Sequence, residues 1–422
     1  MKKNTYWYKV DNAGKIFPAV SGESRSSVFR LTFYLNEIID PTLLTQAVNE
    51  VLPRFEPFAV ELKKGFFWYY LSRNHKPLIV KEEPEIMCKY VPWAKNNGYL
   101  LNVYYYKNKI VLETFHSLSD GTGAMEFLKS ITYRYLTLKG HPLEHEGMIL
   151  SQVPNSKQEA LDMFCHSYDS KPKKKLQEEP AYHMKGEKFA NAFSMCVRIK
   201  APTTQLLDLA RTKGVTLGEY VTALLAYSIY HTDVDCVKSK KPIKMFIPVN
   251  LRRFFPSSTI RNFSLYIKAT FSTQKDWTLD EMLKETKQQF ATQLNQEDLH
   301  QRINSNVGIE QNLLIRLLPL GLKNLAFKLG YHFLAEDIST YSISNLGTVR
   351  LPESMQPFVQ GVEFSIGGTN MAIASYNGNT CLSMNTRIKD LSVIQAFIKT
   401  LTSEGIDVSI DTNYREGYDE IL

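Results

Sequence analysis

Hydrophobic and polar residues alternate in several short runs of the N-terminal third, and these runs predict β-strands. Residues 29–35 have the alternation of a half-buried strand. A helix is predicted over residues 40–51, because Asp40 can cap it, a proline fits its first turn, and apolar residues follow at helical spacing. Two hairpins are predicted over residues 59–71 and 101–115, each with polar residues at its turn.

A change in composition along the chain divides it into two halves. Residues 123–138 have the apolar period of a helix, whereas residues 139–180 are polar, interrupted by prolines and rich in charge. A domain boundary is therefore expected in this polar stretch. The pattern predicts an N-terminal lobe over residues 1–150, a polar linker over residues 151–185 and a C-terminal lobe over residues 186–422.

The second half repeats the mixture of strands and helices. Strands are predicted over residues 193–199, 243–249, 264–271, 340–343 and 359–366, with a hairpin turning at residues 377–379. Helices are predicted over residues 202–211, from Thr216 onward, over 279–335 with a break near Pro319 and Gly321, and over 392–401. Thr216 and Glu219 have the spacing of a capping box. Because strands and helices do not alternate strictly, we expect an α/β fold of the α+β kind, with two lobes that are each a mixed β-sheet covered by helices.

Composition limits the classes of function. The chain has 422 residues, of which 44% are hydrophobic and 22% charged, as in an ordinary globular protein large enough for two domains. Its net charge is +7, and the clearest basic run, residues 171–175, lies in a polar stretch typical of a solvated linker. Nucleic-acid binding is not expected, because no basic stripe with interleaved aromatic residues occurs. The positive surplus suits an anionic cosubstrate, such as a thioester that carries a nucleotide.

Cysteine usage and hydropathy indicate the compartment. The five cysteines are widely spaced and form no CxxC pair, so neither a metal site nor a redox motif is predicted. The first residues lack the apolar core of a signal peptide, and no uncharged apolar run reaches about 18 residues. We therefore expect a reduced, cytoplasmic protein without a transmembrane segment and without a permanently bound cofactor.

The segment with the most chemical content is residues 115–121, Phe-His-Ser-Leu-Ser-Asp-Gly, between a strand-like run and a helical pattern. A neutral imidazole accepts protons near pH 7, so His116 is a candidate general base. Asp120 is placed to orient the ring or to hold the loop, and Gly121 lets the backbone turn without a Cβ clash. A histidine at a strand end is also often structural, and HxxxD alone occurs by chance. Its position at a strand-to-helix junction favours the catalytic interpretation.

Further segments, taken in order, resemble the CoA-dependent acyltransferase superfamily. This superfamily includes chloramphenicol acetyltransferase, plant acyltransferases with HxxxD, condensation domains with HHxxxDG and alcohol O-acetyltransferases. Residues 116–121 match its active-site motif, residues 215–217 resemble the opening of the second lobe, residues 248–252 and 261–263 are similar to P-V-N-x-R and G-N-F, and residues 344–347 resemble a late S-N-x-G turn. Their order from about residue 29 to residue 401 is far more specific than HxxxD alone, and the nearest branch is the bacterial alcohol-acetyltransferase-like group.

Three departures from the family pattern stand out. Phe115 replaces the first histidine of HHxxxDG, which argues mildly against a standard peptide-condensing domain. The DFGWG box of the plant enzymes is absent. Arg261 stands where many relatives have glycine, so the backbone path at that position is not given by the resemblance.

The resemblance implies an active site between the lobes, open to both faces, with acyl-CoA as cosubstrate and a small alcohol or amine as acceptor. His116 would deprotonate the acceptor for direct attack on the thioester, without an acyl-enzyme, and an acetyl group is the expected acyl group. Asp120 would pair with Arg252, while one of Arg252 and Arg253 faces solvent. Oxyanion or substrate contacts are expected from Ser344, Asn345 and the backbone amides of Gly347 or Gly121, and more weakly from Thr369 and Asn385.

Two alternatives to this function remain open. One is a free-standing condensation-type enzyme whose donor is bound to an acyl carrier protein. The other is a non-catalytic binding protein of the same fold, which the intact motif from His116 to Gly121 disfavours.

The leucine-rich segment 312–336 also has more than one interpretation. It is suited to binding a membrane surface or to lining a hydrophobic tunnel for the acceptor. The interpretation that we favour from the sequence is a helix buried between the lobes.

Overall fold

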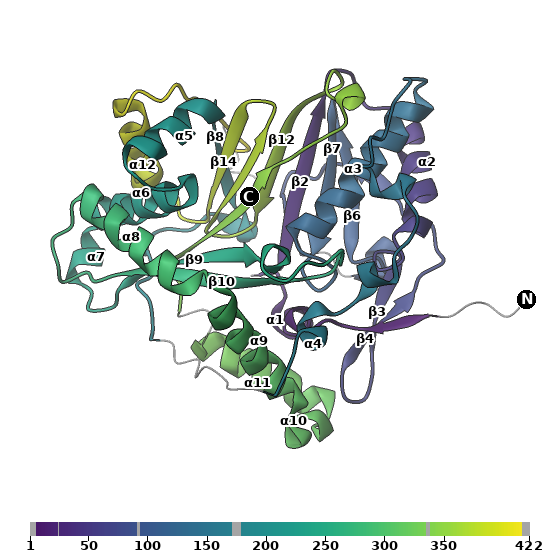
Figure 1. Cartoon of the computed structure of the whole chain (residues 1–422), viewed down its shortest axis with the longest axis horizontal. Helices are drawn as coiled ribbons and strands as arrows, with labels where there is room; N and C mark the ends of the chain where they lie inside the picture. The colour runs from purple at the N-terminus through teal and green to yellow at the C-terminus, as the bar shows by residue number, and fades with distance from the viewer. Residues whose placement is uncertain (1–5, 24, 91–92, 171–178, 335–337, 416–422) are drawn as a thin grey trace, which may run out of the picture.

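The computed structural model describes residues 6–23, 25–90, 93–170, 179–334 and 338–415, with 93–94 and 329–334 described by their backbone alone. Its strands form two large mixed sheets and one small antiparallel sheet. The two large sheets lie side by side, each with helices on its outer face (Figure 1). The expectation of two helix-covered mixed sheets is confirmed.

The five-stranded sheet is the centre of the first lobe. Its central strands are antiparallel, and its edge strand β5 runs parallel to β6. Asp40 caps helix α2 by accepting hydrogen bonds from the amides of Thr42 and Leu43, as its sequence context predicts. The elements of this lobe are, in sheet order, β12 (Val359–Ile366), β2 (Val28–Leu35), β7 (Lys109–Phe115), β6 (Leu101–Tyr106) and β5 (Val80–Glu82), with helices α2 (Pro41–Val51) and α3 (Gly121–Leu138).

The seven-stranded sheet forms the second lobe. Only its strand β11 runs parallel to its neighbours. The predicted capping box is present, with Thr216 accepting from the amide of Glu219 and the Glu219 carboxylate accepting from the amide of Thr216. The strands are, in order, β10 (Ser264–Phe271), β9 (Ile243–Asn250), β11 (Tyr341–Thr348), β13 (Asn370–Tyr376), β14 (Asn379–Thr386), β8 (Met195–Pro202) and β15 (Ser409–Thr412). The helices that cover this sheet are α5 (Thr203–Thr212), α6 (Leu217–Thr232), α8 (Leu279–Gln293) and α12 (Ser392–Ser403).

Strand β12 joins the two halves of the chain. It comes from the second half but pairs with β2 in the first sheet, so that Val362 lies opposite Phe33. Val349, Leu351 and Met355 before it are buried in the core of the first lobe. The second half of the chain therefore contributes one strand to the first lobe. The predicted boundaries at residues 150 and 186 remain a prediction about how the chain divides.

The smallest sheet and a helical arm lie below the two lobes in Figure 1. The small sheet has the order β1 (Trp7–Lys9), β4 (Tyr69–Arg73), β3 (Val60–Lys64). The helical region expected as one element with a break near Pro319 and Gly321 is interrupted earlier as well, at Asn295 and Asn312, whose side chains cap the helices that follow. Gly321 itself lies inside a helix. The helices after α8 are α9 (Gln296–Gln311), α10 (Leu313–Leu317) and α11 (Leu320–Leu334).

The expectation of a buried helix at residues 312–336 is wrong for the part that the structure describes. Leu313, Leu314, Leu317, Leu322 and Leu325 are all more than half exposed. No element among the described residues covers these five leucines, although Leu320 in the same segment is buried. No helix among the described residues is long and apolar enough to cross a membrane.

Candidate active site

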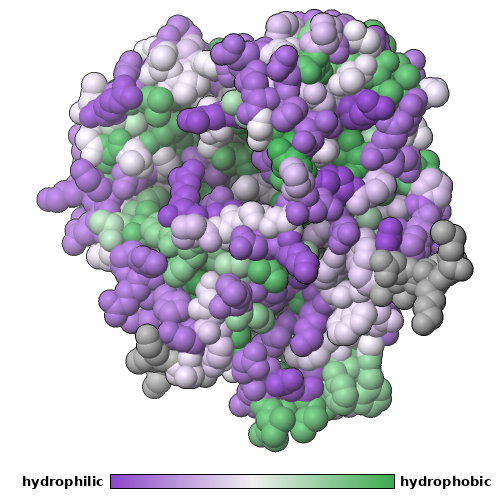
Figure 2. Space-filling model, turned by 45° about the vertical axis from the view of Figure 1, so that its right-hand side comes forward, coloured by the Kyte–Doolittle hydropathy of each residue, from purple (hydrophilic) through white to green (hydrophobic). Residues whose placement is uncertain are grey.

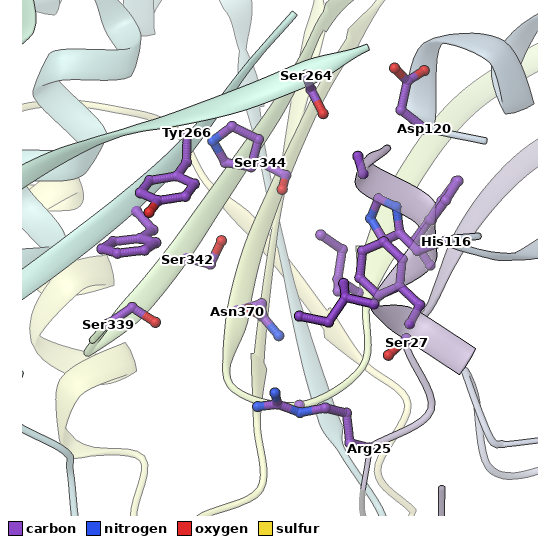
Figure 3. Close-up of a pocket in the computed structure, with 18 of the residues that line it drawn as sticks. Arg25, Ser27, His116, Asp120, Ser264, Tyr266, Ser339, Ser342, Ser344 and Asn370 are labelled. Carbon is purple, nitrogen blue, oxygen red and sulfur yellow. The ribbon is translucent and has the colours of Figure 1, made fainter. Parts of the chain in front are cut away.

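A cavity of about 1370 Å³ lies between the two large sheets. It is lined from the first lobe by residues of β2 and of the loop after β7, and from the second lobe by residues of β9, β10, β11 and β13. Figure 3 shows His116 on one wall and the serines of β10 and β11, Ser264, Ser342 and Ser344, on the facing wall. A side chain from each lobe can therefore reach one ligand.

His116 follows directly on β7, and its ring is held between two aromatic side chains. Phe17 stacks on it with ring centroids 4.9 Å apart and an interplanar angle of 17°. Phe29 of β2 lies on it at the same centroid distance, tilted by 58°. Burial among these rings lowers the pKa of His116 below its ordinary value of 6.5, because the charged imidazolium loses its water. The ring is therefore neutral, and basic, at pH 7.

Asn262 fixes which ring nitrogen of His116 is free. Its Nδ2 donates to the carbonyl oxygen of His116 at 2.8 Å and lies 3.2 Å from Oδ2 of the buried Asp11. These two acceptors orient the amide, so that its Oδ1 faces Nδ1 of the histidine at 3.4 Å. An acceptor at that position favours the tautomer that carries its proton on Nδ1. Nε2 of His116 is then left as the base.

Asp120 is part of the backbone framework and does not contact the imidazole. Its carboxylate accepts hydrogen bonds from the amides of Gly123 and Phe263 and from two nitrogens of Arg252. In Figure 3 it points away from the His116 ring. As N-cap of α3 it holds the loop that carries the histidine. Of the two roles left open by the sequence, the geometry favours holding the loop.

Arg252 is the partner of Asp120, at 2.8 and 3.3 Å, and its side chain is nearly buried. The same guanidinium donates to the carbonyl oxygens of Thr259 and Arg261. It thereby connects the motif loop of the first lobe to the segment after β9. The neighbouring Arg253 is exposed, so one of the two arginines faces solvent, as expected.

Arg261, which replaces a family glycine, is accommodated without a left-handed backbone. Its guanidinium is buried and donates to the carbonyl oxygens of Lys9 and Ala160. It also lies 3.6 Å from the carboxylate of Asp11. The arginine ties the N-terminal segment and the linker to the second lobe.

Gly123, two residues beyond the predicted Gly121, is tightly packed. Gly121 is the first residue of α3 and does not adopt a positive φ, so no turn requires it. A Cβ at Gly121 would lie 3.1 Å from the tip of Leu346 and 3.6 Å from the ring of Phe364, whereas a Cβ at Gly123 would lie 2.0 Å from the carbonyl oxygen of Ile260. At Gly123 the backbone after β9 therefore packs directly against α3.

The expected oxyanion contacts separate into two groups. Ser344, Asn345 and Thr369 line the cavity. The Asn345 side chain accepts from the amide of Gly347, which sits in a β-bulge at φ 77° and does not line the cavity. Asn385 is fully buried, its side-chain amide has no hydrogen-bond partner among the described residues, and it does not line the cavity.

Sequence reasoning missed several residues of this site. Asn262 lies inside a segment noted for its family resemblance, but no role was inferred for it. Asp11 and Phe17 come from the N-terminal segment, far from the motif, and carry no local signal. Tyr266 and Ser264 face the cavity from alternate positions of β10, as the period of two along a strand requires.

One part of the cavity wall is cationic. Arg25, Lys188 and Arg387 line it. Lys188 pairs with Ile388 in an isolated β-bridge, which brings it next to Arg387. Burial and the charge of Arg25 lower the pKa of Arg387, so the two guanidinium groups are close enough to repel. Such a cluster attracts anions.

Comparison with solved structures identifies the fold. The F. graminearum protein TRI101, complexed with coenzyme A and deoxynivalenol, is 11% identical with a TM-score of 0.62, over 96% of this chain and 99% of that chain. Polyketide synthase associated protein 5 from Mycobacterium tuberculosis is 14% identical with a TM-score of 0.57, over 94% and 98%. The starter condensation domain of rhizomide synthetase is 11% identical with a TM-score of 0.58, over 96% and 97%. At these identities the likeness shows the fold alone.

Sequence comparison identifies the family. No protein of curated function matches the chain significantly. A family model, described as alcohol acetyltransferase, matches residues 71–393, which include the histidine motif and the cavity-lining strands β9, β10, β11 and β13, but not β2. This match covers about three quarters of the 422 residues. The chain therefore belongs to the alcohol acetyltransferase family.

Proposed function

We propose that this protein transfers an acyl group from an acyl-CoA thioester to a hydroxyl or amine acceptor, with His116 as the general base. One observation carries the proposal: Nδ1 of His116 faces Asn262, which leaves Nε2 as a neutral base in a cavity lined by both lobes. Family membership supports an acyltransferase. The cavity, at about 1370 Å³, has room for an acceptor beside the pantetheine arm of CoA.

The proposed reaction is a direct transfer. The acceptor hydroxyl or amine donates its proton to Nε2 of His116 while its lone pair attacks the thioester carbonyl carbon. The carbonyl π-electrons move to oxygen and give a tetrahedral oxyanion. When this intermediate collapses, the carbon–sulfur bond breaks and the thiolate takes the proton from the imidazolium. Histidine is neutral again, the products are the ester or amide and free CoA, and no acyl-enzyme forms.

Ser344 is the proposed donor to the oxyanion. It belongs to β11 and faces the cavity across from His116 (Figure 3). A hydroxyl on a strand of a sheet is held more firmly than one on a loop, and donors fixed in advance stabilise developing charge without reorganisation. Asn345 is a second candidate, because its side-chain oxygen accepts from the amide of Gly347 and this leaves Nδ2 as the donor.

The donor phosphates are proposed to bind at the cationic wall formed by Arg25, Lys188 and Arg387. Guanidinium groups match phosphate oxygens in charge and geometry. Binding an anion there would also relieve the repulsion between Arg25 and Arg387. Acyl-CoA affinity should therefore fall as salt is added.

The decisive experiment measures free thiol release from a panel of acyl-CoAs with alcohol and amine acceptors. Wild-type turnover that is lost in His116→Ala would support the proposal. Intact-mass analysis during turnover tests for an acyl-enzyme, which is not expected. If acyl-CoAs are inert and an acylated carrier protein is a donor, the condensation-type alternative replaces this function. If neither donor reacts but ligands bind, the protein is a binding protein of this fold.

The donor site has its own test. Arg387→Ala should raise the KM for acyl-CoA and flatten its dependence on salt. Lys389→Ala is the matched control, because this basic residue lies two positions away, pairs with Glu187 and does not line the cavity. Equal KM values for acyl-CoA in both variants would show that the phosphates do not bind at this wall.

A further inference from the structure

An exposed apolar patch covers the lower end of the molecule, where Figure 1 places α10 and Figure 2 shows a group of hydrophobic side chains. Nine of the eighteen large hydrophobic side chains exposed among the described residues come from three segments here. A monomer scatters such residues singly, so their concentration indicates a binding surface. The apolar patch consists of Phe66, Phe67, Ile309, Leu313, Leu314, Leu317, Leu318, Leu322 and Leu325.

The patch is a preformed surface, because one lysine ties its segments together. Nζ of Lys323 donates to the carbonyl oxygen of Phe67, in the β3–β4 turn, and to that of Arg316 in α10. The same ammonium lies 3.9 Å from the ring centroid of Trp68. The amide of Leu320 donates to the carbonyl oxygen of Phe66 at 2.8 Å. The hairpin tip and the two helices therefore present their apolar side chains together.

Charge around the patch is predominantly basic, and the two nearby carboxylates are each paired with a lysine: Glu310, beside Ile309, with Lys15, and Glu61 with Lys63. Residues 63–70 and 312–328 contain five lysines and arginines and no aspartate or glutamate. Lys64, Arg316 and Lys328 are exposed. Apolar side chains surrounded by basic ones are complementary to an anionic lipid surface. A symmetric contact with a second copy would instead place like charges opposite one another.

The patch is continuous with the cavity. Ile315, Leu318 and Phe327 line the cavity from the helical arm, and Leu318 is also exposed in the patch. Trp68 lines the cavity from the hairpin. A ligand that leaves a membrane at this surface would therefore meet apolar side chains along the way to His116.

We propose that the apolar patch docks this protein onto an anionic membrane surface, and that the acceptor is an amphipathic molecule drawn from that membrane. The proposed docking is supported by the apolar patch alone and does not depend on the enzymatic activity. The statement about the acceptor rests on the proposed acyltransferase function.

Vesicle flotation tests the docking without any assay of activity. The full chain should float with vesicles of phosphatidylcholine and phosphatidylglycerol and much less with phosphatidylcholine alone. Raising the salt from about 0.1 M to about 0.5 M should weaken binding, because the Debye length shortens. The double variant Leu314→Ser with Leu317→Ser should raise the apparent Kd for anionic vesicles by about tenfold or more.

A matched control separates the patch from general surface hydrophobicity. Val234 and Val237, on α7 (Val234–Lys238), are 71% and 48% exposed and lie outside the cavity lining. Val234→Ser with Val237→Ser should float like the wild type. Equal flotation of both double variants would overturn the proposal. So would a wild-type dimer that the patch variant dissociates while neither binds vesicles.

Measurements of turnover test the proposed acceptor class separately from membrane docking. Leu314 and Leu317 do not line the cavity, so the patch variant should retain wild-type turnover of a short, water-soluble alcohol. Its turnover of a long-chain alcohol dissolved in anionic vesicles should fall about tenfold or more, in step with its flotation. Vesicle binding with equal turnover of the dissolved alcohol by both proteins would overturn the acceptor class while leaving docking intact. Absence of any acyl transfer would count against the proposed function and leave the flotation result unaffected.

Discussion

Asn262 contacts His116 twice, donating from Nδ2 to its carbonyl oxygen at 2.8 Å and placing Oδ1 3.4 Å from its ring nitrogen Nδ1. The two residues come from different lobes, so the orientation of the ring depends on how the lobes pack together. We expect Asn262→Ala to lower kcat roughly 10- to 100-fold with little change in KM, because the base loses its alignment.

The pH profile of this variant separates positioning from a structural role. The hydrogen bond to Asn262 raises the pKa of His116 against the dominant effect of burial. Without it the acid limb of kcat/KM should move to lower pH. A variant that folds normally and keeps both kcat and the wild-type profile would show that Asn262 does not act through the ring.

His116→Ala should lower kcat about 10²- to 10⁴-fold, the usual contribution of a general base. The melting temperature should change little, because the ring borders an open cavity. Turnover and thermal unfolding of the purified variant check both statements. Turnover equal to that of the wild type would remove the general-base assignment.

The wild-type rate should depend on pH through His116. The pKa of this ring lies below 6.5, and only its neutral form accepts a proton. The value of kcat/KM should therefore be level near neutrality and fall as the pH drops through the lowered pKa. Measurement from about pH 5 to about pH 8 checks the direction. An acid limb with its midpoint above 6.5 would contradict the burial argument.

Asp120→Asn should reduce both stability and activity. The carboxylate is nearly buried and balances the charge of Arg252, so its neutralisation leaves a buried guanidinium uncompensated. We expect a loss of about 3 kcal/mol in the free energy of unfolding. Urea denaturation measures this loss. Unchanged stability and unchanged turnover would mean that the pair holds neither the loop nor the lobes.

Gly123→Ala should be much more damaging than an alanine at most helical glycines. The new Cβ would lie 2.0 Å from the carbonyl oxygen of Ile260, which belongs to backbone and cannot yield cheaply. We expect a loss of about 3 kcal/mol, at the upper end of overpacking effects. Gly218→Ala in α6 is the control, because its Cβ would meet nothing within 4 Å and its stability should be unchanged or higher by up to about 1 kcal/mol. Similar melting temperatures for the two variants would refute the close approach.

Helix caps and hairpins could be predicted from the sequence, because they depend on residues that are close together in the chain. The caps at Asp40 and Thr216 depend on side chains that reach amides two or three residues away. The hairpin over residues 101–115 depends on alternation and a polar turn. The strands β1, β5 and β15 were missed, because short edge strands carry few alternating positions.

The candidate site was predictable only in part. The motif predicted that His116 and Asp120 lie in one loop, because the strand and the helix that flank them are adjacent in the sequence. The family resemblance supplied Arg252 as the partner of the aspartate. Nothing in the sequence gave Asp11 or Phe17, since contacts between residues a hundred positions apart depend on the fold.

The sequence by itself determined two helix-covered sheets, a histidine at a strand end and a leucine-rich segment at residues 312–336. Tertiary structure alone decided that β12 crosses to the first sheet, that Asn262 orients His116, and that Leu313, Leu314, Leu317, Leu322 and Leu325 stay uncovered. The physical reason is the same in each case. A periodic pattern specifies that an element has an apolar face or a polar group, whereas the partner of that face or group is set by which elements the folded chain brings against it.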